Sequence, residues 1–220
     1  MRLGVAALLA LTCAAALIFA LWPQADIAVA RMFYSGGFIG QSQFERFARA
    51  FFNVTPFVVL AGFAALFVLR HYGVKTPYAP SGRALVFLIA TMAIAPGLVV
   101  NLGLKDHAHR PRPIQTLEFG GTSEFRPWYR FDGACQKNCS FVSGEASEAF
   151  WMVAPASLAP PPWRGPAITA ALIFGAAASL LRMAFGGHYL SDVVLAALIT
   201  LLIIEAMRWL LWRGKDSFRP

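Results

Sequence analysis

The sequence predicts an all-α integral membrane protein, a bundle of six transmembrane helices with an additional helix in the membrane interface. Composition is the first reason: 58% of the 220 residues are hydrophobic and only 14% are charged, whereas a soluble domain has about 25% charged residues. The mean hydropathy of +0.58 is the second. So few charges cannot cover a soluble globule, and the chain is too apolar to be disordered. The third reason is that long apolar runs recur along the sequence. The length of the chain suits a single domain, residues 1–220.

Six apolar segments approach or reach the length needed to cross the hydrocarbon core, about 20 mainly apolar residues. The first two contain no charged residue, and the third has Pro96 and Asn101 as its only irregularities. The fourth is shorter and carries Glu145 and Glu148 near its start. In chain order, the predicted spans are Leu3–Trp22, Phe51–Leu69, Ala84–Leu104, Gly144–Pro160, Gly165–Leu181 and Val193–Trp212.

The first apolar segment has an alternative interpretation as a secretory signal peptide, because Met1 and Arg2 precede it. Its run is long for such a peptide, and no clear small-x-small cleavage site follows. Cys13 would suggest a lipoprotein site, but it lies in the middle of the run. We therefore expect a retained transmembrane helix.

A short amphipathic segment, Gln41–Asn53, precedes the second span. Four phenylalanines recur there at helical spacing, on the face opposite the polar residues. This pattern is typical of a helix that lies in the membrane interface, although a lid or an additional core helix would show the same pattern. The phenylalanines are Phe44, Phe47, Phe51 and Phe52, and the polar residues are Gln43, Glu45, Arg46 and Arg49.

The distribution of charge predicts that both termini are cytoplasmic. An even number of spans places both termini on one side, and the short inner loops that result are where the positive-inside rule applies. The net charge of +8 would suit a nucleic-acid partner in a soluble protein, but in so apolar a chain we expect Lys and Arg at membrane edges. The basic residues of the inner segments are Arg2, Arg70, Lys75, Arg83, Arg164, Arg208, Arg213, Lys215 and Arg219, against the acids Glu205 and Asp216.

Two cysteines in the second outer loop, Cys135 and Cys139, are spaced for a local disulfide, which persists in an oxidising compartment. Half of a metal site of the C-x3-C type is the alternative, but no second pair is present to complete it. The cysteines therefore agree with the predicted orientation.

Three polar clusters are predicted to meet at the outer surface, and charged groups beside spans either mark function or anchor the membrane edge. They are Lys105–Pro113, Ser143–Glu145 and Arg182–Asp192. Lys105, Arg112 and Arg182 would form a clamp for an oxyanion such as phosphate, and the N–H groups behind Ser143 and Gly144 would add to it.

Within the third cluster, His188 has the position of a nucleophile, because Asp192 follows at i+4 and can fix its tautomer. The reaction would be phosphoryl transfer through a phosphohistidine, without a metal or other cofactor. The alternatives are that each basic residue is an interfacial anchor and that Glu145 only favours the positive end of its helix. His107 and His109 would be loop residues near the site, and Arg110 a surrounding or surface cation.

The order of these residues resembles the three-part signature of the type 2 phosphatidic acid phosphatase superfamily, which includes membrane lipid phosphatases and soluble vanadium haloperoxidases. The chain departs from it at Val142, where the family has Pro, at Glu145, where the family has His, and at Leu181, where the family has Ser. The elements K-x6-R-P, P-S-G-H and S-R-x5-H-x3-D correspond to Lys105, Arg112 and Pro113, to Val142, Ser143, Gly144 and Glu145, and to Leu181, Arg182, His188 and Asp192. The motif core thus covers residues 105–192.

The resemblance implies a helical bundle with an outward-facing phosphatase site. It implies that His188 is the nucleophile, that Asp192 orients it, and that phosphate is held by Lys105, Arg112, Ser143, Gly144 and Arg182. The family's histidine at position 145 protonates the leaving group. Either Glu145 is the general acid, or the substrate has a good leaving group, or His107 or His109 substitutes.

The leading functional hypothesis is a lipid phosphatase of a bacterial inner membrane with its active site facing the periplasm. The substrate classes are phosphatidylglycerol phosphate, phosphatidic acid, undecaprenyl diphosphate and the phosphates of lipid A, and the Ser-Gly-Glu variant favours lipid A or a related lipid. The alternatives are a lipid phosphotransferase and a non-catalytic protein that binds an anionic lipid. The expected partners are the phosphorylated lipid and the bilayer, with no nucleic acid and no obligatory protein partner.

Overall fold

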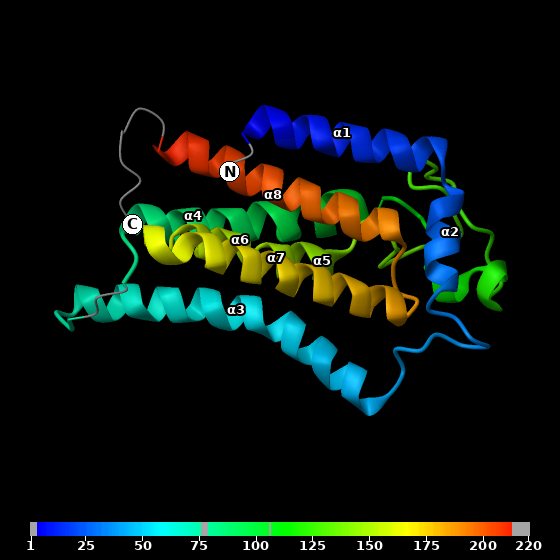
Figure 1. Cartoon of the computed structure of the whole chain (residues 1–220), viewed down its shortest axis with the longest axis horizontal. Coiled ribbons are helices and arrows are strands. Elements are labelled where there is room, and N and C mark those ends of the chain that lie inside the picture. The colour runs from blue at the N-terminus through cyan, green and yellow to red at the C-terminus, as the bar shows by residue number, and fades with distance from the viewer. Residues whose placement is uncertain (1–3, 76–78, 106, 213–220) are drawn as a thin grey trace.

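The computed structural model describes residues 4–75, 79–105 and 107–212, and within these ranges the chain folds into a helical bundle with only two isolated β-bridges (Figure 1). The predicted all-α membrane fold is thus confirmed. Several residues on which the span and charge predictions rest lie outside the described ranges: Arg2, Leu3, Arg213, Lys215, Asp216 and Arg219.

The helices vary greatly in length. In chain order the elements are α1 (Val5–Leu21), α2 (Gln24–Arg31), α3 (Gln43–His71), α4 (Gly82–Met92), η1 (Ala93–Lys105), η2 (Pro113–Gln115), η3 (Leu117–Phe119), α5 (Gly144–Phe150), α6 (Val153–Ser157), α7 (Pro161–Ala184) and α8 (Leu190–Trp212). Two short 3₁₀ turns, η2 and η3, lie in the loop between η1 and α5.

The expected number of six spans is too high for the described part of the chain. Four helices are long and apolar enough to cross a membrane on their own: α3, the continuous pair α4 and η1, α7 and α8. A fifth crossing requires α1 and α2 to be counted together, although they are bent by 85° at their junction. Pro23 lies at that junction, and α1 alone has 17 residues, which is slightly short for the hydrocarbon core.

The predicted fourth span, Gly144–Pro160, is broken into the two short helices α5 and α6, which together lie inside the bundle rather than forming one long helix. Pro155 explains the break, because its ring lacks an N–H and clashes with the carbonyl four residues earlier, that of Trp151. The Trp151 carbonyl instead accepts a bond from the N–H of Ala154 at 2.7 Å.

The predicted interfacial helix is not a separate element. Residues 43–71 form the single helix α3, which therefore includes both the amphipathic segment and the second span. Figure 1 shows that α3 bends, so that its first turns diverge from the rest of the bundle. Pro56 lies inside this helix and supplies the physical reason for a bend. The amphipathic pattern is nevertheless real, since Phe44 and Phe47 are exposed on the outer face.

The interior of the bundle is packed around α5 and α6, which contact α4, α7 and α8. Trp151, between α5 and α6, is completely buried, and its indole N–H donates to the Thr91 hydroxyl at 3.0 Å. Phe87 and Leu88 of α4 and Ile204 of α8 complete this apolar cluster. A buried Trp that also has a hydrogen-bond partner is a stable centre for such a core.

All the predicted polar clusters lie at one end of the bundle. The end of η1, the start of α5 and the turn between α7 and α8 lie together there, and α2 crosses the same end (Figure 1). The described chain begins and ends at the opposite end, where α1 starts and α8 finishes. The alternation of helix directions is what brings motifs that are far apart in sequence to one depth.

Candidate active site

His188 lies in the turn between α7 and α8, where its side chain is 1% exposed. Its Nδ1 atom is 2.7 Å from the Ser140 carbonyl oxygen, and a carbonyl can only accept, so Nδ1 carries the proton. The Nε2 atom then has a free lone pair. The structure therefore gives His188 the tautomer that a nitrogen nucleophile requires.

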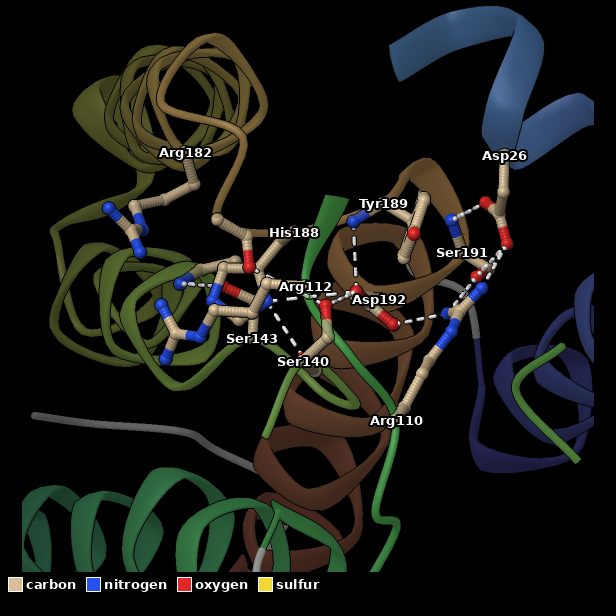
Figure 2. A network of polar contacts seen from close by, with 12 residues as sticks. Asp26, Arg110, Arg112, Ser140, Ser143, Arg182, His188, Tyr189, Ser191 and Asp192 are labelled. Carbon is tan, nitrogen blue, oxygen red and sulfur yellow. Dashed lines mark hydrogen bonds and ion pairs between the residues drawn. The ribbon is translucent and has the colours of Figure 1, made fainter. Parts of the chain in front are cut away.

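Asp192 supports this arrangement less directly than the i+4 spacing suggested. Its Oδ2 atom is 3.7 Å from Nδ1 of His188, which is too long for a hydrogen bond. The same oxygen accepts bonds from the Ser140 hydroxyl and from the backbone N–H of Tyr189. Asp192 thus fixes Ser140, and Ser140 fixes His188. Figure 2 shows Ser140 between the histidine and the carboxylate.

Of the two placements expected for Arg110, around the site or on the surface, the structure agrees with the first. It is not a surface cation but is completely buried, with one guanidinium nitrogen on Asp192 and the other on Asp26 at 2.7 Å (Figure 2). Its Cζ atom also lies 4.3 Å from the centre of the Tyr189 ring, within the range of a cation–π interaction. The two carboxylates raise the pKa of Arg110 against the opposing effect of burial.

Asp26, on α2, is a functional residue that sequence reasoning missed. Besides Arg110, its carboxylate accepts bonds from the backbone N–H and the hydroxyl of Ser191, at 2.8 and 2.6 Å. It therefore joins α2 to the start of α8, three residues after His188. Nothing near Asp26 in sequence indicates partners 84 and 165 residues away.

Burial has the largest effect on the pKa of His188. It lowers the pKa of the imidazole to about 4, although Asp192 acts in the opposite direction and Arg182 adds to the lowering. The ring is therefore neutral at physiological pH. A neutral imidazole with its proton on Nδ1 presents Nε2 to an electrophile.

This pKa shift predicts a pH dependence of stability. Between pH 6.5 and about 4 the unfolded chain binds a proton at His188 that the folded chain does not, so stability is lost as the pH falls through this window. The His188→Asn variant has no imidazole at this position, so it lacks this pH-dependent loss of stability. The thermal midpoint in detergent should therefore fall more for the wild type than for the variant between about pH 7 and about pH 4.5. Parallel curves would show that His188 is not a buried neutral imidazole.

The three cations of the expected phosphate clamp lie near His188, and their role in holding phosphate stays a prediction. Arg182, near the end of α7, is buried, and its Nε has no hydrogen-bond partner within the described residues. Gly187 makes room for it, since a Cβ there would lie 2.5 Å from Nη2 of Arg182. Lys105, at the end of η1, lies within the electrostatic range of both Arg182 and Arg112. Together these cations form a site for an anion.

Ser143 and Gly144 open α5 beside this group. The Ser143 hydroxyl accepts a bond from the N–H of Ala146 at 3.2 Å and so caps the helix. A Cβ on Gly144 would lie 2.5 Å from the side-chain oxygen of Asn101, so glycine lets the Asn101 side chain pack closely against the start of α5. The two residues lie where the sequence predicted, and their role in holding phosphate stays a prediction.

Glu145 is engaged by two arginines. The guanidinium of Arg49, on α3, binds both carboxylate oxygens, with its Nη2 2.6 Å and its Nε 3.0–3.2 Å away. The Nε atom of Arg182 is 3.3 Å from Oε1. Burial raises the pKa of Glu145, which lies outside the four long spans, but Arg49 and Arg182 lower it more, and the net shift is downward. An ionised carboxylate in a bidentate pair is poorly suited to donate a proton.

The two loop histidines are held by backbone atoms. Nδ1 of His107 is 3.1 Å from the Gly103 carbonyl, and Nδ1 of His109 is 2.8 Å from the Cys135 carbonyl. This fits the expectation that they are loop residues. Within the described residues, no group of three His, Cys, Asp or Glu side chains could hold a metal ion.

The predicted disulfide between Cys135 and Cys139 is confirmed. The loop that it closes carries Asn138, whose φ of +55° is tolerated by asparagine. Arg112 donates to the Asn138 carbonyl and side-chain oxygen at 2.9–3.2 Å, and Ser140 directly follows the second cysteine. Burial lowers the pKa of Arg112, which nevertheless remains a cation. The disulfide loop therefore holds Arg112 and adjoins Ser140, whose carbonyl accepts from His188.

We expect the double replacement of Cys135 and Cys139 by Ser to lower kcat/KM by roughly 10–100-fold, because small displacements of positioned groups have large kinetic effects. Stability should change by no more than about 2 kcal/mol, since the closed loop is short. Steady-state kinetics and thermal unfolding of the oxidised wild type and the variant provide the measurement, with Cys13→Ser as the matched control because Cys13 is a free exposed cysteine. An unchanged kcat/KM in the double variant would show that the disulfide does not position the residues of the site.

Comparison with known proteins gives one family and three relatives. The sequence profile of the PAP2 superfamily matches residues 84–216. A lipid A 4'-phosphatase of Francisella tularensis subsp. novicida (strain U112) is 35% identical over 212 residues, covering 91% of this chain and 92% of the relative. Lipid A 4'-phosphatases of Rhizobium leguminosarum and Rhizobium etli are 40% and 34% identical, over 59% and 86% of this chain and 55% and 75% of those proteins. No solved structure matches significantly.

Proposed function

The chain belongs to the PAP2 superfamily and is a membrane lipid phosphatase, and we propose that it removes a phosphate monoester from lipid A or a closely related lipid through a phosphohistidine on His188. The observation that carries the mechanism is the state of His188. The ring is neutral, its proton is fixed on Nδ1 by the Ser140 carbonyl, and it lies beside a group of cations.

The proposed reaction has two steps. In the first, the Nε2 lone pair of His188 forms a bond to phosphorus while the bond from phosphorus to the lipid oxygen breaks, and that oxygen takes up one proton from solvent, which is balanced by the proton that the attacking water releases in the second step. In the second, a water oxygen attacks phosphorus, the N–P bond breaks, and inorganic phosphate leaves. Charge that develops on the phosphoryl oxygens is stabilised by the surrounding cations and N–H groups. Those groups belong to Lys105, Arg112, Ser143, Gly144 and Arg182.

Three similarities support lipid A as the substrate class. All three relatives are lipid A 4'-phosphatases, and one of them is matched over nearly the whole length of both chains. The match also includes segments outside the family profile, which begins at residue 84. Those segments include α2 and α3, which contribute Asp26 and Arg49 to the site.

The protein is a multi-pass protein of a bacterial inner membrane, and we propose that its site faces the periplasm with both termini in the cytoplasm. The disulfide adjoining the site supports this orientation, because such bonds persist in an oxidising compartment. The described chain also begins and ends at the opposite end of the bundle from the site (Figure 1).

A phosphate-release panel tests the function. Purified protein in detergent would be given lipid A, phosphatidic acid, phosphatidylglycerol phosphate and undecaprenyl diphosphate, with His188→Asn as the inactive control. We expect lipid A to have the highest kcat/KM, and mass spectrometry to show the loss of one phosphate from the 4' position. Preferential hydrolysis of another lipid would refute lipid A, and transfer of phosphate to a second lipid would indicate a phosphotransferase.

A further inference from the structure

We propose that Arg49 is a fourth phosphate-binding cation, absent from the three-part signature, and that Glu145 is the positioning residue that holds it at the site. This inference rests on the proposed function, since it concerns the same phosphate. It assigns a substrate-binding role to α3, which lies outside the segment matched by the family profile.

Arg49 and Arg182 come from different helices but lie on either side of one carboxylate. Oε1 of Glu145 is 2.6 Å from Nη2 of Arg49 and 3.3 Å from Nε of Arg182. The Cζ atoms of both arginines also lie 5.7 Å from the centre of the Phe185 ring. The two guanidiniums therefore share one aromatic neighbour and one anionic oxygen. An oxygen of a bound phosphate could bridge them in the same manner.

Arg182 provides an independent indication that an anion binds between the two guanidiniums. Its side chain is 4% exposed, yet its Nε has no hydrogen-bond partner within the described residues, because the contact to Glu145 is an ion pair without hydrogen-bond geometry. A buried unpaired donor on a charged group is costly unless a ligand satisfies it. A phosphate oxygen is the acceptor that the proposed reaction brings there.

The charge balance explains why this chain requires an additional cation. The family has a histidine at position 145, whereas this chain has a carboxylate, which offsets one of the positive charges of Lys105, Arg112 and Arg182. Arg49 restores that charge. Its side chain is 41% exposed, compared with 19% for Glu145, so it lies at the rim, where an incoming phosphate can reach it.

The position of Arg49 also suits a substrate held in a bilayer. Phe44 and Phe47 lie on the same first turns of α3 and are 76% and 73% exposed, so this face of the helix is suited to contact lipid. Arg49 points instead to Glu145. A phosphate on a lipid headgroup that approaches along α3 would therefore meet Arg49 before it reaches the buried Arg182.

The test uses Arg49→Ala, Arg49→Lys, Glu145→Gln and the double variant Arg49→Ala/Glu145→Gln, with Arg46→Ala as the matched control. Arg46 lies one turn earlier on α3 and is exposed, and its guanidinium donates to the Gln41 carbonyl. Two quantities are measured: the Kd of orthovanadate, a phosphate mimic that binds without turnover, and kcat and KM for the lipid substrate.

We expect Arg49→Ala to raise the vanadate Kd and the KM by roughly 10–100-fold, the scale of one charge-assisted contact, while kcat changes less. Arg49→Lys should keep part of the affinity, because it keeps the charge without the bidentate geometry. The double variant should bind vanadate more tightly than Arg49→Ala, since it no longer has an unpaired carboxylate. Glu145→Gln should affect phosphomonoesters and diphosphates equally.

Equal vanadate affinity in Arg49→Ala and the wild type would overturn the proposal, as would an equal loss in Arg46→Ala. A loss for Glu145→Gln confined to phosphomonoesters would instead make Glu145 the general acid. Failure of the proposed function gives a different result: the wild type would then release no phosphate from any lipid, while the vanadate measurement would still report on Arg49.

Discussion

Replacing His188 with Asn abolishes turnover while leaving the fold intact, with an expected loss of roughly 10⁴–10⁶-fold in kcat, the scale seen when a nucleophile is removed. Asparagine is the informative replacement because its side-chain amide can still donate to the Ser140 carbonyl, which now accepts from Nδ1 of His188 at 2.7 Å. The buried acceptor therefore stays satisfied. Only the nucleophilic nitrogen is lost.

The control for this variant is Asp192→Asn, for which we expect a smaller loss of turnover. Asp192 reaches His188 through the Ser140 hydroxyl, so the histidine tautomer survives its replacement. Phosphate release and thermal unfolding would be measured on both proteins. A His188→Asn variant that retains more than about 1% of the wild-type kcat would exclude His188 as the nucleophile.

Arg110→Leu should destabilise the protein by about 3–5 kcal/mol, the largest effect on stability that we expect from a single replacement. Arg110 is completely buried between the carboxylates of Asp26 and Asp192. Its removal leaves two buried negative charges without the cation that both of them contact. Chemical denaturation in detergent provides the measurement, and Arg130→Ala is the control because Arg130 pairs with Asp132 on the surface.

A second variant shows whether charge or packing is responsible. Adding Asp26→Asn to Arg110→Leu removes one unpaired carboxylate and should recover part of the lost stability, which is a non-additive result expected only of groups in direct contact. Additive losses in the double variant, or a loss of less than about 1 kcal/mol in Arg110→Leu, would contradict the account of the buried triad.

The elements that depend on local pattern were predictable from sequence. Apolar runs of sufficient length predicted α3, the pair α4 and η1, α7 and α8, and their alternating directions bring the end of η1 and the turn between α7 and α8 to one end of the bundle. The order of the motifs then predicted the family, and the spacing of Cys135 and Cys139 predicted the disulfide.

The predicted helix boundaries differ from the structure where the mean polarity of a segment does not determine where a helix begins or ends. Pro155 interrupts a run that is otherwise apolar enough for a span, so Gly144–Pro160 becomes two short helices. The amphipathic start of α3 looked like a separate element because its polarity differs from that of the following turns, yet no helix-ending residue separates the two parts.

The residues that sequence reasoning missed are those whose partners are distant in the chain. Ser140 contacts His188 across 48 positions and Arg49 contacts Glu145 across 96. Neither belongs to the recognised signature, and the amphipathic pattern that includes Arg49 indicates a helix face but no partner for it. One signal was available: Glu145 replaces a histidine beside two arginines, which implies a compensating cation somewhere in the chain.

The central claim, phosphoryl transfer through His188, is tested most directly by trapping the intermediate. The wild type would be mixed with ³²P-labelled lipid substrate, quenched in alkali within the first turnovers, digested and mapped by mass spectrometry. The account predicts label on the peptide containing His188, stable in alkali and released by acid, as expected of a phosphorus–nitrogen bond, and absent from His188→Asn. Label on any other residue, or rapid phosphate release with no labelled protein at any time, would contradict it.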